Sequence, residues 1–266
     1  MQLSGHIQKM HTHLHRGVAQ YQLPIGERLL AMNDLVGEPI ELRFNGEILC
    51  SHCGRPTKKS YSQGHCYPCS QKLPSCDLCI MKPETCHYHL GSCRDDSWGE
   101  AHCFIPHVIY LANSSGVKVG ITRQTNIPSR WIDQGAVQAL PILSVDSRLK
   151  SGQLEVALKA FVADKTNWRQ MLKNEVEPLD LVAVRDELLP KIEQQALALG
   201  AQTLNNEVLE INYPVVEYPG KIHSLNFDKT PDITGVLKGI KGQYLLLDSG
   251  VLNIRKFSAY HIDLRY

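Results

Sequence analysis

Hydrophobic and polar positions change their period several times along the chain. They alternate over residues 18–23 and 39–44, which is the period of a strand with one buried face. Residues 107–112 and 117–121 are short apolar runs separated by Asn-Ser-Ser-Gly, a pattern that predicts a β-hairpin. From Gln153 onward apolar residues recur at helical spacing. The chain therefore mixes strands with helices.

These elements predict an α+β fold, in which Asn45-Gly46 is a tight-turn dipeptide of the N-terminal part. The C-terminal part resembles strands of a small β-barrel, which the N-terminal strands are candidates to complete. The expected parts are a β-rich segment (1–49), a zinc-ribbon-like cysteine-rich region (50–105), an α/β core (106–210) and a barrel-like β segment (211–266).

Helices are expected mainly within the 106–210 part. Ser129 is a candidate N-cap for a short helix that Gly135 ends. A third strand over residues 140–145 and a short helix from Trp168 follow. A longer helical stretch covers residues 178–199, and Pro190 is expected to kink it or split it in two.

All nine cysteines lie between residues 50 and 103. Cys50, Cys53, Cys66 and Cys69 form two CxxC pairs with twelve residues between them, a strong signal for a tetrahedral zinc site. In each CxxC turn two thiolates reach one ion while nearby backbone amides stabilise the sulfurs. Disulfides are the alternative, but the odd count and the absence of a visible signal peptide disfavour them.

A second zinc is expected among the later cysteines. Cys76 and Cys79 are its first candidates, with Cys86 and Cys93 as the simplest completion. His89 or Cys103 can replace either of the last two, so the ligand set stays open. One or two structural zinc ions would supply much of the folding free energy of this region, because structural zinc contributes about 10–16 kcal/mol in small peptides.

The composition favours a soluble, cytoplasmic protein. Of 266 residues 43% are hydrophobic, enough for packed cores, and no apolar run approaches the roughly 20 residues of a membrane span. The formal net charge is only +1. Residues 118–173, however, carry nine Lys and Arg against four Asp and Glu. A basic segment in a neutral protein is a candidate polyanion-binding surface, with a solvated charged face as the alternative.

The hairpin region resembles the core of the GIY-YIG endonucleases. The first strand carries Val-Ile-Tyr ending at Tyr110, and the second carries Lys-Val-Gly starting at Lys118. An arginine on the next helix and a glutamate on a later one complete the family pattern, and Arg130 and Glu155 stand at suitable places. The whole chain also resembles a bacterial family of proteins of unknown function, through its CxxC pairs and the segments 118–123 and 130–136.

The resemblance to GIY-YIG enzymes implies a role for each matching residue. Tyr110 would orient or deprotonate a water molecule, Arg130 would clamp the phosphate, and Glu155 would hold magnesium or manganese. Arg123 is a second candidate clamp. DNA or RNA would be the substrate, and the activity that of a divalent-metal-dependent phosphodiesterase.

One departure from the family pattern favours other functions. Lys118 replaces the second family tyrosine, and lysine is ordinarily a cation that binds phosphate rather than a base. The alternatives are a non-catalytic DNA- or RNA-binding protein with a degenerate core, and a zinc-stabilised scaffold for a protein partner.

Overall fold

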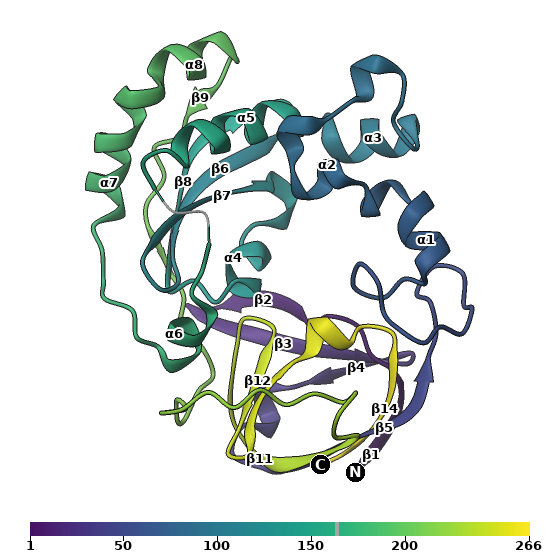
Figure 1. The fold of residues 1–266 in the computed structure, drawn as a ribbon. Coiled ribbons are helices and arrows are strands. Elements are labelled where there is room, and N and C mark those ends of the chain that lie inside the picture. The colour runs from purple at the N-terminus through teal and green to yellow at the C-terminus, as the bar shows by residue number, and fades with distance from the viewer. Residues whose placement is uncertain (163–164) are drawn as a thin grey trace.

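The computed structural model describes residues 1–162 and 165–266 and contains three sheets (Figure 1). Two β-rich layers lie together with both chain termini, and the third sheet carries helices on one of its faces. The cysteine-rich segment leaves the β-rich part and arches to the third sheet as a separate arm. We call residues 50–105 the arm.

A six-stranded antiparallel sheet joins the two ends of the chain. Its order is β1-β14-β5-β11-β12-β13. In the described part of the chain the pairing ends at β1 and β13, so the sheet is open and the expected barrel is not closed. The strands are β1 (Gln2–His6), β5 (Pro39–Ile48), β11 (Asp232–Lys241), β12 (Tyr244–Leu247), β13 (Gly250–Asn253) and β14 (Tyr260–Arg265).

The Asn45-Gly46 dipeptide does not make the turn that the sequence predicts. β5 continues through it and pairs with β14 on both sides of it, with a shift of register between. Gly46 has φ +92°, so the dipeptide forms a bulge. The prediction was wrong because two strands from the other end of the chain flank β5 and keep it extended.

The other two sheets are smaller. A three-stranded sheet contains β2 (His11–His15), β3 (Val18–Ile25) and β4 (Arg28–Ala31). The sheet of the 106–210 part is built on the hairpin that the sequence predicts, β6 (His107–Asn113) and β7 (Val117–Arg123). Its further strands are β8 (Gln138–Val145), β9 (Gln202–Thr203) and β10 (Leu209–Glu210).

The helices follow the expected order with shifted ends. α4 (Ser129–Asp133) starts one residue early, and the Ser129 hydroxyl donates to Asn126 O instead of capping the helix. The predicted long helix is split at Pro190, because proline cannot continue the hydrogen-bond ladder. The remaining helices of this part are α5 (Arg148–Leu158), α6 (Trp168–Lys173), α7 (Leu181–Leu188) and α8 (Glu193–Ala198).

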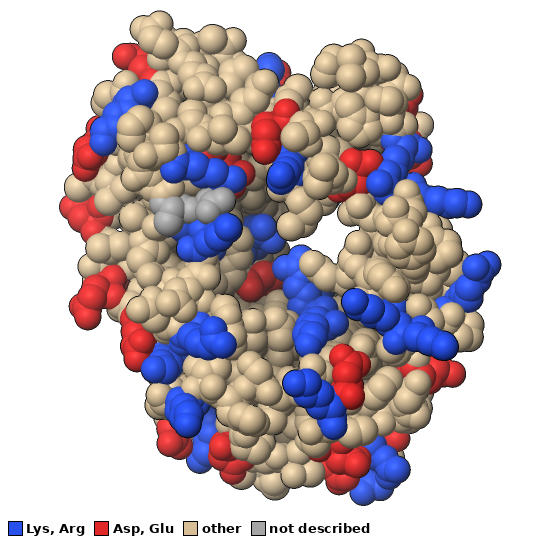
Figure 2. All heavy atoms as spheres, viewed as in Figure 1, with Lys and Arg blue, Asp and Glu red and all other residues tan. Residues whose placement is uncertain are grey.

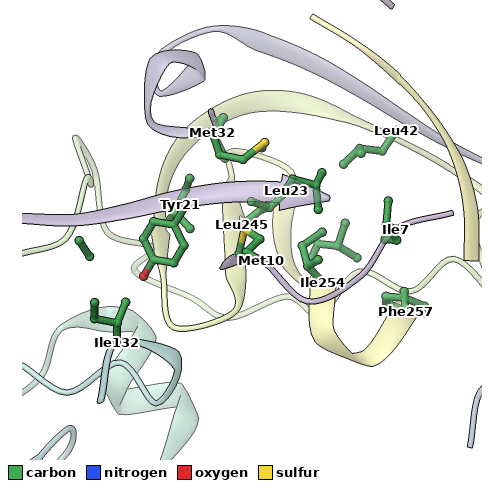
Figure 3. Packing of buried hydrophobic residues seen from close by; sticks show 14 of the residues in the cluster. Ile7, Met10, Tyr21, Leu23, Met32, Leu42, Ile132, Leu245, Ile254 and Phe257 are labelled. Carbon is green, nitrogen blue, oxygen red and sulfur yellow. The ribbon is translucent and has the colours of Figure 1, made fainter. Parts of the chain in front are cut away.

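Alternating residues of β6 face two different cores. Tyr110 joins the larger core, in which α4 meets the β-rich layers, and Ile109 joins a core beneath α5 and α7. Figure 3 shows Ile132 of α4 below Tyr21 of β3 in the larger core. Because one continuous core joins these elements, α4 has a fixed position against the β-rich part.

The arm, all of which the structure describes, has no long helix, as its cysteine, glycine and proline content predicts, but the expected zinc-ribbon-like architecture is not confirmed. Its described residues form no named strand, and the second CxxC pair starts a short helix with Cys66 at the N-cap. The short helices of the arm are α1 (Tyr67–Lys72), α2 (Leu78–Met81) and α3 (Asp96–Cys103), with 3₁₀ turns between them. One turn, Pro83–Thr85, packs on α5: a Cβ built on Gly152 would lie 2.6 Å from Cβ of Pro83. No helix in the described part of the chain has the length and apolar character of a membrane span.

Candidate zinc site and arginine-lined cavity

The four cysteines of the two CxxC pairs converge at the base of the arm. The sulfur atoms of Cys50, Cys53, Cys66 and Cys69 all lie within 4.8 Å of one another. The separation between Cys53 Sγ and Cys66 Sγ is 3.8 Å. Zinc–sulfur bonds of about 2.3 Å in a tetrahedron require sulfur atoms about 3.8 Å apart, so this set fits zinc.

The backbone prepares one of these sulfurs for metal binding. Burial by itself raises the pKa of Cys50, but hydrogen bonds from the backbone N–H groups of Cys53, Cys66 and His52 outweigh it and lower the pKa to about 6. Burial and the neighbouring thiols raise the pKa of Cys69 to about 12. A cluster that cannot ionise fully by itself is stabilised by a divalent cation, which neutralises the thiolates.

The later metal candidates are distributed over three places. Cys79, Cys86, Cys93 and Cys103 line a small cavity of about 20 Å³. Cys76 lies outside that cavity, with its sulfur 3.8 Å from His65 Nδ1. His89 is exposed.

Asp77, Cys79 and His87 form a further group whose ligand atoms lie within 4.8 Å of one another. The spacing of the cysteines does not predict Asp77 or His87 as ligands. Burial and the negative charge of Asp77 raise the pKa of Cys79 to about 12.

A second feature lies between the arm and the sheet of the 106–210 part. It is a cavity of about 350 Å³, which we call the arginine cavity. Residues of the arm, such as Ser62, Cys76 and Ile80, line one side of it. Figure 2 shows an opening beside the arm with Lys and Arg side chains at its margin. The other side carries four arginines from four separate elements: Arg123, Arg130, Arg148 and Arg255.

Neutral groups hold two of these arginines in place. Nη2 of Arg148 donates to the carbonyl oxygen of Ile80 at 2.6 Å, and Nε of Arg255 donates to Oε1 of Gln63 at 2.5 Å. The Nε atoms of Arg123 and Arg148 are buried without a hydrogen-bond partner. In the described part of the chain none of the four arginines forms a salt bridge, so their charges are not neutralised by carboxylates.

Asp77 lines the cavity, and Asp133 is close enough to Arg255 to oppose the lowering of its pKa by burial, but both carboxylates are engaged by other cations. Asp77 pairs with Arg94 at 2.6 Å, and Asp133 pairs with Lys9 at 2.7 Å. Burial, and then the neighbouring guanidinium groups, lower the pKa of Arg148, although Cys103 partly opposes this. The cavity therefore concentrates positive charge in a partly desolvated place, which is the arrangement of an anion site.

The structure places Tyr110 behind this cavity. Its side chain is fully buried, and its hydroxyl donates to Oε1 of Gln134 at 2.9 Å. Burial raises the pKa of Tyr110, and the neighbouring Arg130 guanidinium opposes the rise. Tyr110 and Arg130 are thus neighbours, but of these two residues only Arg130 lines the cavity.

Lys118 and Glu155 have partners in the protein. Nζ of the buried Lys118 donates to Oγ1 of Thr166 at 2.6 Å. Glu155 lies on α5 and pairs with Lys159 at 3.3 Å. Of the five residues of the family pattern, Arg123 and Arg130 meet at the cavity. No local sequence signal points to Arg255, and Arg148 stands out in the sequence only as one charge of the basic segment.

Comparison with known proteins gives one match. A family model described as "Protein of unknown function (DUF2797)" matches residues 37–262, a stretch that includes the arm and all four cavity arginines. No curated protein and no solved structure matches the chain.

Proposed function

This chain belongs to the DUF2797 family of proteins of unknown function, and we propose that it binds nucleic acid by holding the phosphodiester backbone in the arginine cavity. The observation that carries the proposal is the meeting of four arginines in one cavity, none with a carboxylate partner in the described part of the chain. Zinc at Cys50, Cys53, Cys66 and Cys69 would hold the base of the arm in place.

Arginine side chains suit a phosphate group in this setting. A guanidinium group donates two parallel hydrogen bonds to two phosphate oxygens, and the bond is stronger where water is excluded. The buried Nε atoms of Arg123 and Arg148 have no hydrogen-bond partner in the protein. A bound anion would supply the missing acceptors and offset the repulsion between the like charges.

The arm supports a polymer rather than a small phosphate compound. Residues 50–76 contain four Lys and Arg and no Asp or Glu, so the positive surface extends beyond the cavity. Tyr67 is 57% exposed and packs edge-on against Tyr61, with Lys59 over the Tyr61 ring. Exposed aromatic rings among cations are the usual surface for stacked bases and a neighbouring backbone.

Phosphodiester cleavage of the GIY-YIG type is the second candidate function. The contact between Arg130 and Tyr110 favours it, because the resemblance requires this pair. Glu155 would then hold magnesium or manganese. The full burial of Tyr110 favours binding without cleavage, since a base or water-orienting group has to meet a water molecule.

The binding proposal is tested by titrating labelled single-stranded and duplex DNA and RNA with the zinc-loaded protein. We expect Arg123→Ala to weaken binding at least several-fold, because it removes a phosphate contact. Since Arg123 Nε has no hydrogen-bond partner in the protein, the substitution leaves no acceptor of Nε unsatisfied. Arg43→Ala is the matched control, because Arg43 is an exposed arginine on β5 outside the cavity. Equal affinity of Arg123→Ala and wild type would contradict the proposal.

The cleavage proposal needs a separate measurement. The same oligonucleotides and a supercoiled plasmid are incubated with magnesium or manganese, and products are compared for wild type and Glu155→Ala. If wild type cleaves these substrates and Glu155→Ala does not, the result supports phosphodiester cleavage of the GIY-YIG type. Binding of intact substrate by both proteins, with no product, leaves the non-catalytic function. Copurified protein in place of nucleic acid would favour the scaffold alternative.

A further inference from the structure

Four cysteines outside the first zinc site line one small cavity in the outer part of the arm. Cys79 lies in α2, Cys86 follows the 3₁₀ turn after it, and Cys103 ends α3. Cys93 reaches the cavity from the loop before α3, where its sulfur would lie 3.4 Å from a Cβ built on Gly99. The cavity volume of about 20 Å³ has room for one small ion or one water molecule.

The polar side chains of Asp77 and His87 beside this cavity already have hydrogen-bond or ion-pair partners. The Asp77 carboxylate accepts from Cys79 N at 3.1 Å and pairs with Arg94 at 2.6 Å. Nδ1 of His87 lies 2.9 Å from Ser92 Oγ, and its Nε2 lies 3.5 Å from Asp77. These groups form a hydrogen-bonded frame around the cavity, in the position that residues supporting a metal site usually take.

We infer that Cys79, Cys86, Cys93 and Cys103 bind a second structural zinc ion, and that Cys76 is a free thiol. Four cysteines around one small cavity match the Cys₄ class of structural zinc sites. Their sulfur atoms do not all lie within 4.8 Å of one another, so the side chains would turn inward around the ion. Arg94, which also lines the cavity, is paired with Asp77. Cys76 ends the 3₁₀ turn before α2 and lines the arginine cavity instead. The sequence pairs Cys76 with Cys79, but Asp77 caps α2 between them and the two side chains serve different cavities.

The position of this site gives it a structural purpose. α2 carries Ile80, whose carbonyl oxygen accepts from Arg148 at 2.6 Å, and the turn after α2 packs on Gly152 of α5. Cys103 comes just before β6 and is close enough to Arg148 to affect its pKa. An ion that joins α2, the following turn and α3 would therefore fix the arm side of the arginine cavity.

The first test uses the wild-type chain. Zinc-loaded protein, purified without added chelator, is counted for metal and treated with a thiol-alkylating reagent before peptide mass spectrometry. We expect two zinc ions per chain, with Cys76 alkylated and the other eight of the nine cysteines protected. A chelator without reductant should expose all nine, which separates metal protection from disulfides. One zinc per chain, with the four cavity cysteines alkylated, would overturn the inference.

A second test distinguishes the possible ligand sets. Cys86→Ser and Cys103→Ser should each bind one zinc, whereas Cys76→Ser and His87→Ala should retain two. If His87→Ala loses a zinc while Cys103→Ser keeps both, the ligands are those of the group containing Asp77 and the inference is wrong. If a serine variant is insoluble, the wild-type count and alkylation pattern decide. Neither readout depends on nucleic-acid binding, so failure here is distinct from failure of the proposed function.

Discussion

Tyr110 and Gly120 face each other across the β6–β7 hairpin, and the tyrosine hydroxyl fills the space that a side chain at position 120 would need. The two residues are paired in register. A Cβ built on Gly120 would lie 2.6 Å from the Tyr110 hydroxyl oxygen. Because that hydroxyl is also beside Gln134 and Arg130, the glycine helps to set the place of one cavity arginine.

Gly120→Ala should therefore destabilise the protein by about 1–3 kcal/mol, the usual cost of overpacking a filled core. The tyrosine ring has to shift, and with it the end of α4. Urea unfolding of the zinc-loaded protein measures the effect. Gly220→Ala is the matched control, since no atom lies within 4 Å of a Cβ there. Equal unfolding midpoints for the two variants would show that Tyr110 yields without cost.

The local features of this protein could be predicted from its sequence. The spacing of Cys50, Cys53, Cys66 and Cys69 predicts a four-thiol cluster, and the structure brings these sulfurs together. The apolar runs around Asn113-Ser-Ser-Gly116 predict the β6–β7 hairpin, which is confirmed. Both signals lie within a short stretch of chain, where turn chemistry and ligand spacing decide the structure.

Features that depend on contacts between distant parts of the chain could not be predicted from the sequence. Arg255 reaches the arginine cavity only because the C-terminal strands share a sheet with β5, which leads into the arm. Asn45-Gly46 is a good turn in isolation, yet flanking strands convert it into a bulge. Cys76 and Cys79 have the spacing of a zinc knuckle, but in the structure they line different cavities.

The contact between the arm and α5 should be sensitive to one methyl group. A Cβ on Gly152 would lie 2.6 Å from Pro83 Cβ and 2.8 Å from Glu84 N, so Gly152→Ala has to push the arm away from α5. We expect nucleic-acid affinity to fall several-fold although no arginine is changed. Titration of a labelled oligonucleotide measures this, with Gly220→Ala as the control. Unchanged affinity would mean that the arm does not shape the binding surface.

Zinc removal should unfold the arm before the sheets. The arm contributes few residues to the two large cores, so bound metal has to supply much of its stability. Hydrogen exchange with and without chelator should show lost protection over residues 50–103 and retained protection in β6 and β8. Chelator saturated with zinc is the control. Equal protection of the arm in both samples would contradict a structural metal.

Lys241 should make the free energy of unfolding depend on pH in the alkaline range. Its side chain is fully buried, Nζ donates to Asn174 Oδ1 at 2.7 Å, and burial lowers the pKa to about 8. The unfolded chain has the ordinary lysine pKa of about 10.4. Between these values the unfolded state holds more protons, so stability rises with pH.

The measurement compares unfolding free energies of wild type and Lys241→Met at pH 7.5 and 9.5. Other titrating groups are common to both proteins and cancel in the difference. We expect the unfolding free energy of wild type, relative to that of Lys241→Met, to rise by about 1–2 kcal/mol from pH 7.5 to pH 9.5. A difference that stays constant would mean that the lysine keeps its ordinary pKa.

Binding of a phosphate backbone by the cavity arginines is tested most directly by the salt dependence of affinity. For a duplex, log K falls with log salt by about 0.9 for each phosphate contact. Removing two contacts in the double variant Arg123→Ala, Arg255→Ala should make the slope shallower by about 1.8, while Arg43→Ala keeps the wild-type slope. A double variant with the wild-type slope would show that these arginines do not contact phosphate.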